Sequence, residues 1–255
     1  PAVTGWSGVV KPSAGLAILA VAAFVVFAAA TAPARVIFDA AAEPAGLRAA
    51  MVQGTVWDAQ IVRLSAGGPP VADVRARLRP ASLITGAARF DIEARDPSLR
   101  GQGVLALSLA GAALEEVEGV AALSRLSLPV SLPDGQSARV EIDELALDRN
   151  GRCRAAEGRV MTTGLSAAGE AFGADLPALE GVFLCAGDAV ALDVSGRSAS
   201  LAVSGRIRFE HAGPVWRLEA RSTDRDVIAA VSMLGFSQTG PGVFELDSRT
   251  LQEES

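Results

Sequence analysis

Two patterns of hydrophobic residues divide this chain of 255 residues. The first is an apolar run from Gly15 to Ala32 that contains no charged residue. Its length is close to the roughly 20 residues that a helix needs to cross a bilayer. The second pattern begins at Leu47, where apolar and polar residues alternate with a period of two. The first pattern predicts a membrane-spanning helix, and the second predicts β-strands.

The alternation is clearest in residues 73–79, 89–95, 201–209 and 216–221. Successive side chains of a strand point to opposite faces, so each of these segments has one apolar and one charged face. Such strands are typical of antiparallel sheets that expose one face to water. Further strands are predicted at Met51–Ile61, Val104–Leu109, Val140–Leu147, Cys153–Met161, Leu179–Cys185, Val190–Val194 and Val243–Asp247.

Turn signals separate the predicted strands, and Asn150-Gly151 gives the clearest tight hairpin. Two segments depart from the alternation. Ala112 to Leu123 carries three glutamates and is interpreted as a short helix. Asp224 to Leu234 has an acidic start, apolar residues at helical spacing and a stop at Gly235, which predicts a second helix.

These elements predict an all-β, mainly antiparallel fold. We expect a curved sheet or sandwich of about 10–12 strands with one or two short helices, preceded by one N-terminal transmembrane helix. The expected segments are a short cytoplasmic stretch at 1–14, the transmembrane helix at 15–34, a linker at 35–46, a periplasmic β-rich domain at 47–248 and a C-terminal tail at 249–255.

The apolar run has a second interpretation as a cleaved signal peptide. Ala30-Thr31-Ala32 is a small-x-small cleavage pattern, but Pro33 follows it directly and the run exceeds a typical signal core. These features favour a retained helix. Lys11 before the run and Arg35 after it leave the orientation undecided by charge alone.

The chain has two cysteines, Cys153 and Cys185. An even count in a secreted domain suggests a disulfide, and two buried free thiols are the alternative. A disulfide would place the large domain outside the cytoplasm. The spacing of the cysteines, together with a single histidine, does not suit a metal site.

Composition and motifs argue against several functions. A net charge of −6 and a sequence pI of about 5.0 oppose binding to nucleic acid. Gly101-Gln-Gly103 superficially matches a dinucleotide fingerprint, but it opens a strand instead of a helix. The only histidine, His211, has no nucleophile motif beside it, and its ordinary interpretation is an exposed turn residue. We therefore expect no catalytic residue, no cofactor and no metal.

Three short segments carry a resemblance to a known family. They are Gly54-Thr55-Val56-Trp57, the stretch Leu78-Arg79-Pro80-Ala81-Ser82-Leu83-Ile84-Thr85-Gly86, and Leu234-Gly-Phe-Ser-Gln-Thr-Gly240-Pro-Gly242. With the preceding apolar run, this arrangement resembles the general secretion pathway protein N family, the N component of type II secretion systems. The residues that carry the resemblance most specifically are Gly54, Thr55, Val56, Trp57, Leu78, Pro80, Leu83 and Gly86. Trp57 itself can be a core residue, an interfacial anchor or a partner contact.

The resemblance implies a small inner-membrane protein with one span, a periplasmic β-rich domain and no catalytic residues. Its implied role is a non-enzymatic structural or accessory component of a type II secretion system, with other inner-membrane subunits as partners. Open sheet edges could serve such contacts by pairing with a strand of a partner. A periplasmic carrier of lipid or another hydrophobe, built on a curled sheet, is the alternative, and a hydrolase that uses His211 is a third hypothesis.

Overall fold

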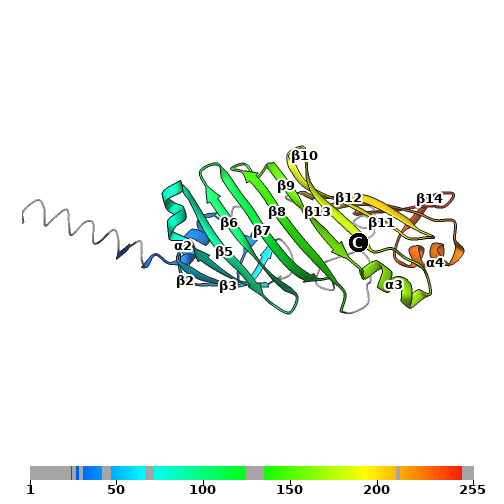
Figure 1. Ribbon diagram of the computed structural model, residues 1–255, viewed down its shortest axis with the longest axis horizontal. Coiled ribbons are helices and arrows are strands. Elements are labelled where there is room, and N and C mark those ends of the chain that lie inside the picture. The colour runs from blue at the N-terminus through cyan, green and yellow to red at the C-terminus, as the bar shows by residue number, and fades with distance from the viewer. Residues whose placement is uncertain are drawn as a thin grey trace, which may run out of the picture.

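The computed structural model describes residues 24, 27–28, 31–41, 47–66, 72–123, 135–210 and 213–248. Within these described residues, fifteen strands form one sheet in which every strand pair is antiparallel, and the strands mostly follow one another in chain order (Figure 1). The edge next to β3 is formed by β1 and β2, and β15 separates β13 from the opposite edge strand, β14. The strands are β1 (Leu47–Arg48), β2 (Met51–Thr55), β3 (Asp58–Ala66), β4 (Ala72–Leu78), β5 (Ala87–Arg95), β6 (Leu99–Ser108), β7 (Gly111–Ala122), β8 (Ser137–Asp148), β9 (Cys153–Thr162), β10 (Leu179–Ala186), β11 (Ala189–Arg197), β12 (Ala202–Glu210), β13 (Gly213–Arg221), β14 (Ser237–Gly240) and β15 (Val243–Asp247).

In the described parts of residues 34–248, four short helical elements accompany the sheet: α2 (Ala34–Ala41), the 3₁₀ helix η1 (Pro80–Thr85), α3 (Gly164–Phe172) and α4 (Arg225–Met233). The all-β, antiparallel prediction is confirmed. The expected strand number of 10–12 was too low. One reason is that the predicted strand Met51–Ile61 is a hairpin, because the chain turns at Val56 and Trp57 between β2 and β3.

The helix expected at Ala112–Leu123 is wrong, because this segment forms β7. Glu116 has a φ of 51° and occupies a bulge, at which the register with the neighbouring strand β6 shifts. A bulge places an extra residue in one strand and interrupts the alternation of faces. The glutamates of β7 therefore do not follow a period of two, although the strand continues through them.

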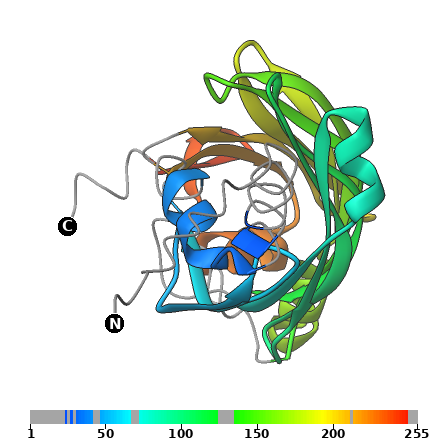
Figure 2. The same cartoon turned by 90° about the vertical axis from the view of Figure 1, so that its left-hand side faces the viewer.

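The sheet curls along its length into an open trough, and Figure 2 shows α2 and α4 inside the curve. Glycines contribute to this curvature. A Cβ at Gly101 would lie 2.7 Å from the carbonyl oxygen of Glu118, and one at Gly205 would lie 2.3 Å from that of Arg217. Because the neighbouring backbone approaches so closely, only glycine fits at these two positions.

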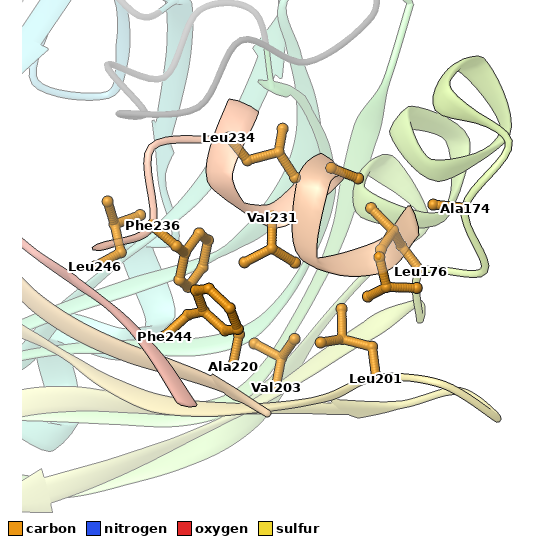
Figure 3. Close-up of a cluster of buried hydrophobic side chains, with 12 residues drawn as sticks. Ala174, Leu176, Leu201, Val203, Ala220, Val231, Leu234, Phe236, Phe244 and Leu246 are labelled. Carbon is orange, nitrogen blue, oxygen red and sulfur yellow. The ribbon is translucent and has the colours of Figure 1, made fainter. Parts of the chain in front are cut away.

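A hydrophobic core fills the C-terminal end of the trough between α4 and the sheet (Figure 3). Val227, Val231 and Phe244 are almost completely buried, at 1–2% exposure. The helix starts as the sequence predicts, because the Asp224 carboxylate accepts hydrogen bonds from the backbone N–H groups of Asp226 and Val227. The predicted helix at Asp224–Leu234 is thereby confirmed as α4.

Strands β9 and β10 are joined in two ways. Backbone pairing between the two strands begins at the pair Leu179–Thr162 and ends at the pair Val182–Arg159. Near the other end of the two strands, Cys153 and Cys185 form a disulfide with a Cα–Cα distance of 5.6 Å. The disulfide therefore links β9 to β10 beyond the last backbone pair between them.

The predicted span Gly15–Ala32 lies mostly outside the described residues. Phe24, Phe27, Ala28 and Thr31 are described and helical, and the two phenylalanines are exposed. Among the described helices, none has both the length and the apolar character that a membrane crossing requires. After this segment the chain meets the domain directly, since Val56 donates a backbone hydrogen bond to the Ala32 carbonyl and Pro33 pairs with Thr55.

Candidate functional site: an apolar concave face

One row of small and apolar residues crosses the sheet from β2 to β15. Residues that pair directly across antiparallel strands share a face, so the register defines this row without ambiguity. It belongs to the face on which α4 packs, which we call the concave face. The row consists of Val52, Ile61, Val74, Ala94, Gly101, Gly119, Val140, Val160, Gly181, Val194, Gly205, Leu218 and Leu246.

Neighbouring rows on the concave face have the same character. A second row lies four or five residues further along the strands and consists of Leu78, Phe90, Leu105, Leu114 and Leu145, which are paired in series from β4 to β8. All five are half-buried. These rows place no charged side chain on the concave face, although 20% of the chain is charged.

The charges lie on the opposite, convex face, where they form ion pairs between strands. Asp193 pairs with Arg206 of the next strand, and Asp91 with Arg79. The hydrogen bond from Arg206 holds the pKa of Asp193 below its usual value of 3.8, and the hydrogen bond from Arg79 does the same for Asp91. The convex face is thus a solvated, charge-paired surface, as the alternation predicted.

The concave face deepens into a cavity of about 230 Å³ beside the α4 core. Its floor is formed by strands β8 to β13 and β15, and Leu165 of α3 and Phe236 contribute to its walls. The lining residues are Leu123, Ala138, Val160, Thr162, Leu165, Leu179, Glu180, Gly181, Leu192, Val194, Val203, Ile207, Trp216, Leu218, Phe236 and Leu246. Only Thr162, Glu180 and Trp216 carry side chains with polar atoms.

Trp216 contributes a buried polar atom next to this cavity. Its indole Nε1 is buried and has no hydrogen-bond partner among the residues that the structure describes. A buried tryptophan N–H usually finds an acceptor, so an unpaired one calls for an explanation. The sequence analysis placed Trp216 in a strand but did not recognise it as a site residue. No local signal distinguishes it, because the cavity arises from strand pairing.

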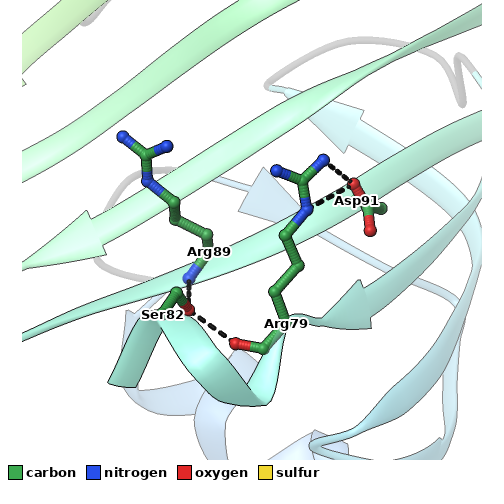
Figure 4. Close-up of polar contacts among 4 residues, drawn as sticks. All are labelled: Arg79, Ser82, Arg89 and Asp91. Carbon is green, nitrogen blue, oxygen red and sulfur yellow. Dashed lines mark hydrogen bonds and ion pairs between the residues drawn. The ribbon is translucent and has the colours of Figure 1, made fainter. Parts of the chain in front are cut away.

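The family motif Leu78 to Gly86 forms η1 and its two ends (Figure 4). Ser82 attaches the helix to β5, because its hydroxyl donates to the Arg79 carbonyl at 2.6 Å and accepts from the Arg89 backbone N–H at 3.0 Å. Gly86 ends the helix with a φ of 80°. Pro80 begins it, and Leu83 is 47% exposed. This motif therefore builds a local turn, away from the cavity.

The motif Gly54-Thr55-Val56-Trp57 ends β2 and forms the turn to β3. Gly54 has a φ of 88°, and a Cβ there would lie 2.2 Å from the Asp58 carbonyl oxygen. Glycine is therefore required at this turn. The sequence had suggested that Trp57 lies in a strand. In the structure it is half-buried within the turn and belongs to no strand.

The described residues show no constellation for catalysis or metal binding. No group of three or more potential ligands for a metal occurs among them. Gly101 and Gly103 lie within β6, which continues as a strand, so no phosphate-binding turn follows them. The prediction for His211 concerns a residue outside the described part of the chain.

Comparison with known proteins identifies the class. The sequence profile of the family described as type II secretion system (T2SS), protein N, matches residues 45–247. The chain belongs to this family, which confirms the resemblance seen in its motifs. The match covers the whole described sheet, and family membership indicates a component of a type II secretion system. No curated protein and no solved structure matches the chain.

Proposed function

We propose that this protein is a non-enzymatic component of a type II secretion system that acts by protein–protein contacts in the periplasm. In this proposal the Gly15–Ala32 run is a retained inner-membrane anchor, and other inner-membrane subunits of the system are the partners. The observation that carries the proposal is an open sheet, without a recognisable catalytic site in its described part, in a member of this family.

The sheet offers a defined surface for such a contact. Strand β14 ends the strand order, and no described strand pairs with its outer side. Ser237, Gln238 and Thr239 on this strand are exposed. An exposed strand edge presents backbone donors and acceptors that a strand of another protein can pair with.

The anchor and the domain are closely connected in this proposal. The backbone contacts that tie Ala32 and Pro33 to Val56 and Thr55 lie at the C-terminal end of the apolar run. A retained anchor would therefore hold the β2 end of the sheet near the membrane surface. The disulfide between Cys153 and Cys185 supports an oxidising compartment for the domain.

Site-specific photo-cross-linking in cells tests this proposal. A photoreactive residue at Gln238 should form adducts with other secretion subunits. The same residue at Ser204, which is exposed in the middle of the convex face, is the control and should form few adducts. Adducts of equal yield at both positions would contradict a contact through the β14 edge. A complete lack of secretion subunits among the adducts would contradict the proposed partners.

A further inference from the structure

We propose that η1 is a membrane-contacting element, whose Leu83 and Ile84 side chains enter the interface of the bilayer that holds the apolar run. This inference rests on the retained anchor of the proposed function and adds a second contact with the same membrane. It involves neither the β14 edge nor the cavity of the concave face.

The burial pattern of η1 is the reverse of that of an ordinary surface helix. Such a helix buries its apolar residues and exposes its polar ones. In η1 the buried residue is Ser82, at 9% exposure, whereas Ile84 is 90% and Leu83 47% exposed. The Ser82 hydroxyl is satisfied by its bonds to the backbone of Arg79 and Arg89 (Figure 4). The helix is therefore attached to the sheet through a polar residue and holds two aliphatic side chains toward the outside of the domain.

Backbone hydrogen bonds fix η1 close to the end of the apolar run. The Val56 N–H donates to the Ala32 carbonyl at 3.0 Å, and the Leu78 N–H donates to the Trp57 carbonyl at 3.1 Å. Pro80, the first residue of η1, follows Leu78 by two positions. Because Ala32 is the last residue of the apolar run, a retained anchor would hold η1 at the membrane surface.

Other exposed apolar side chains lie at the same end of the sheet. Val36 of α2 is 64% exposed and Met51 of β2 is 50% exposed, and α2 packs against β2. Figure 2 looks onto this end, where α2 (blue) and η1 (teal) both face the viewer. Ala87 pairs with Ser108, so the hairpin tip with Leu109, which is 82% exposed, lies beside the end of η1. Exposed apolar side chains that gather in one region mark a contact with a protein or a membrane.

The position and the size of this surface favour the membrane. A stable protein interface buries roughly 800 Å² on each partner, far more than the side chains of one short helix provide. A few apolar side chains can instead enter the boundary between headgroups and acyl chains, and the gain grows with the apolar area that they bury. Since the anchor already holds the chain at the bilayer, this second contact is intramolecular and needs little affinity of its own.

Fluorescence quenching in vesicles tests the inference. The full chain carries one genetically encoded fluorescent amino acid and is reconstituted into vesicles of phosphatidylethanolamine and phosphatidylglycerol, a fraction of which have brominated acyl chains. The fluorophore replaces Phe24 of the apolar run, Ile84 of η1, or Val182, which is 51% exposed on the convex face of β10. Bromine should quench the fluorophore at positions 24 and 84 and leave it bright at position 182.

The three positions separate failure of the contact from failure of the anchor. Quenching at position 24 without quenching at position 84 would keep the anchor and overturn the contact through η1. Quenching at position 84 alone would support the contact but contradict the anchor on which the proposed function relies. Quenching at neither position would overturn both, and equal quenching at positions 84 and 182 would overturn the assignment to η1.

A matched pair of variants tests the role of Ile84 itself. With the fluorophore at Leu83, Ile84→Glu should reduce quenching at least about threefold, because it places a carboxylate where an apolar side chain enters the interface. Val182→Glu introduces the same carboxylate at another exposed aliphatic position and should leave the quenching unchanged. Both replaced side chains are exposed, so both variants should keep the circular dichroism spectrum of the unaltered chain. Equal quenching in the two variants would overturn the contribution of Ile84.

Discussion

The backbone carbonyl of Trp57 accepts a hydrogen bond from the backbone N–H of Leu78 at 3.1 Å. This bond joins the two most specific sequence motifs of the family, because Trp57 ends the first and Leu78 begins the second. Both motifs shape turns near the β2 end of the sheet. Their residues therefore serve the local structure by which the chain enters and folds the first strands.

The glycines of these two motifs should differ in their sensitivity to substitution. Gly54→Ala places a methyl group against the Asp58 carbonyl in a left-handed backbone conformation. We expect it to lower the free energy of unfolding by about 2–3 kcal/mol. Gly86→Ala has the same kind of backbone but nothing within 4 Å of the added Cβ, so about 1 kcal/mol is expected. Urea unfolding measures both, and equal losses would contradict a steric role of the Asp58 carbonyl.

The disulfide should stabilise the fold substantially. Its cysteines are 32 positions apart, and a closed loop of this size contributes about 3–4 kcal/mol by the chain-entropy estimate. Replacing both Cys153 and Cys185 by serine should lower the free energy of unfolding by this amount, and reduction of the wild-type protein should have the same effect. The expectation fails if a reductant leaves the urea midpoint of the wild-type protein unchanged.

The core under α4 should be the most sensitive part of the domain. Phe244 is 1% exposed and lies between the sheet and α4. Phe244→Ala should cost about 3–5 kcal/mol of unfolding free energy, because it removes a buried ring and leaves a cavity. Phe209, which is 44% exposed, provides the control, and Phe209→Ala should cost far less. A comparable loss in the two variants would show that the C-terminal core does not determine stability.

Stability should decline in acid. The arginine partners of Asp58, Asp91 and Asp193 hold the pKa of these carboxylates below 3.8, so the folded state binds their protons less readily than the unfolded state. Their contribution is present above about pH 4 and is lost as the pH falls through the lowered values. Because the pairs are exposed, the effect should be small and weaken with salt. Asp193→Asn should flatten the decline of the urea midpoint between pH 4 and pH 2, whereas a slope unchanged by Asp193→Asn would contradict this assignment.

The parts of the fold that depend on local signals could be predicted from the sequence. Alternation in β4, β5, β12 and β13 defined strands with one charged face, and Asp224 with Gly235 defined α4. The disulfide was predicted from the even number of cysteines in a domain expected to be secreted. Two free thiols remained the alternative, because the sequence does not show that β9 and β10 bring Cys153 and Cys185 together.

The features that depend on strand pairing could not be predicted. The bulge at Glu116 hides the periodicity of β7, and the turn at Trp57 is short enough to be interpreted as continuous strand. The concave row and the cavity at Trp216 emerge only when the register of many strands is known. The sequence shows that each strand has an apolar face, but not that these faces form one open trough.

The proteins that co-purify with the full chain from gently solubilised membranes test the central claim most directly. We predict that inner-membrane subunits of a type II secretion system are enriched over a control purification. Recovery of the chain without any secretion subunit would contradict its assignment as a contact-forming component of that system.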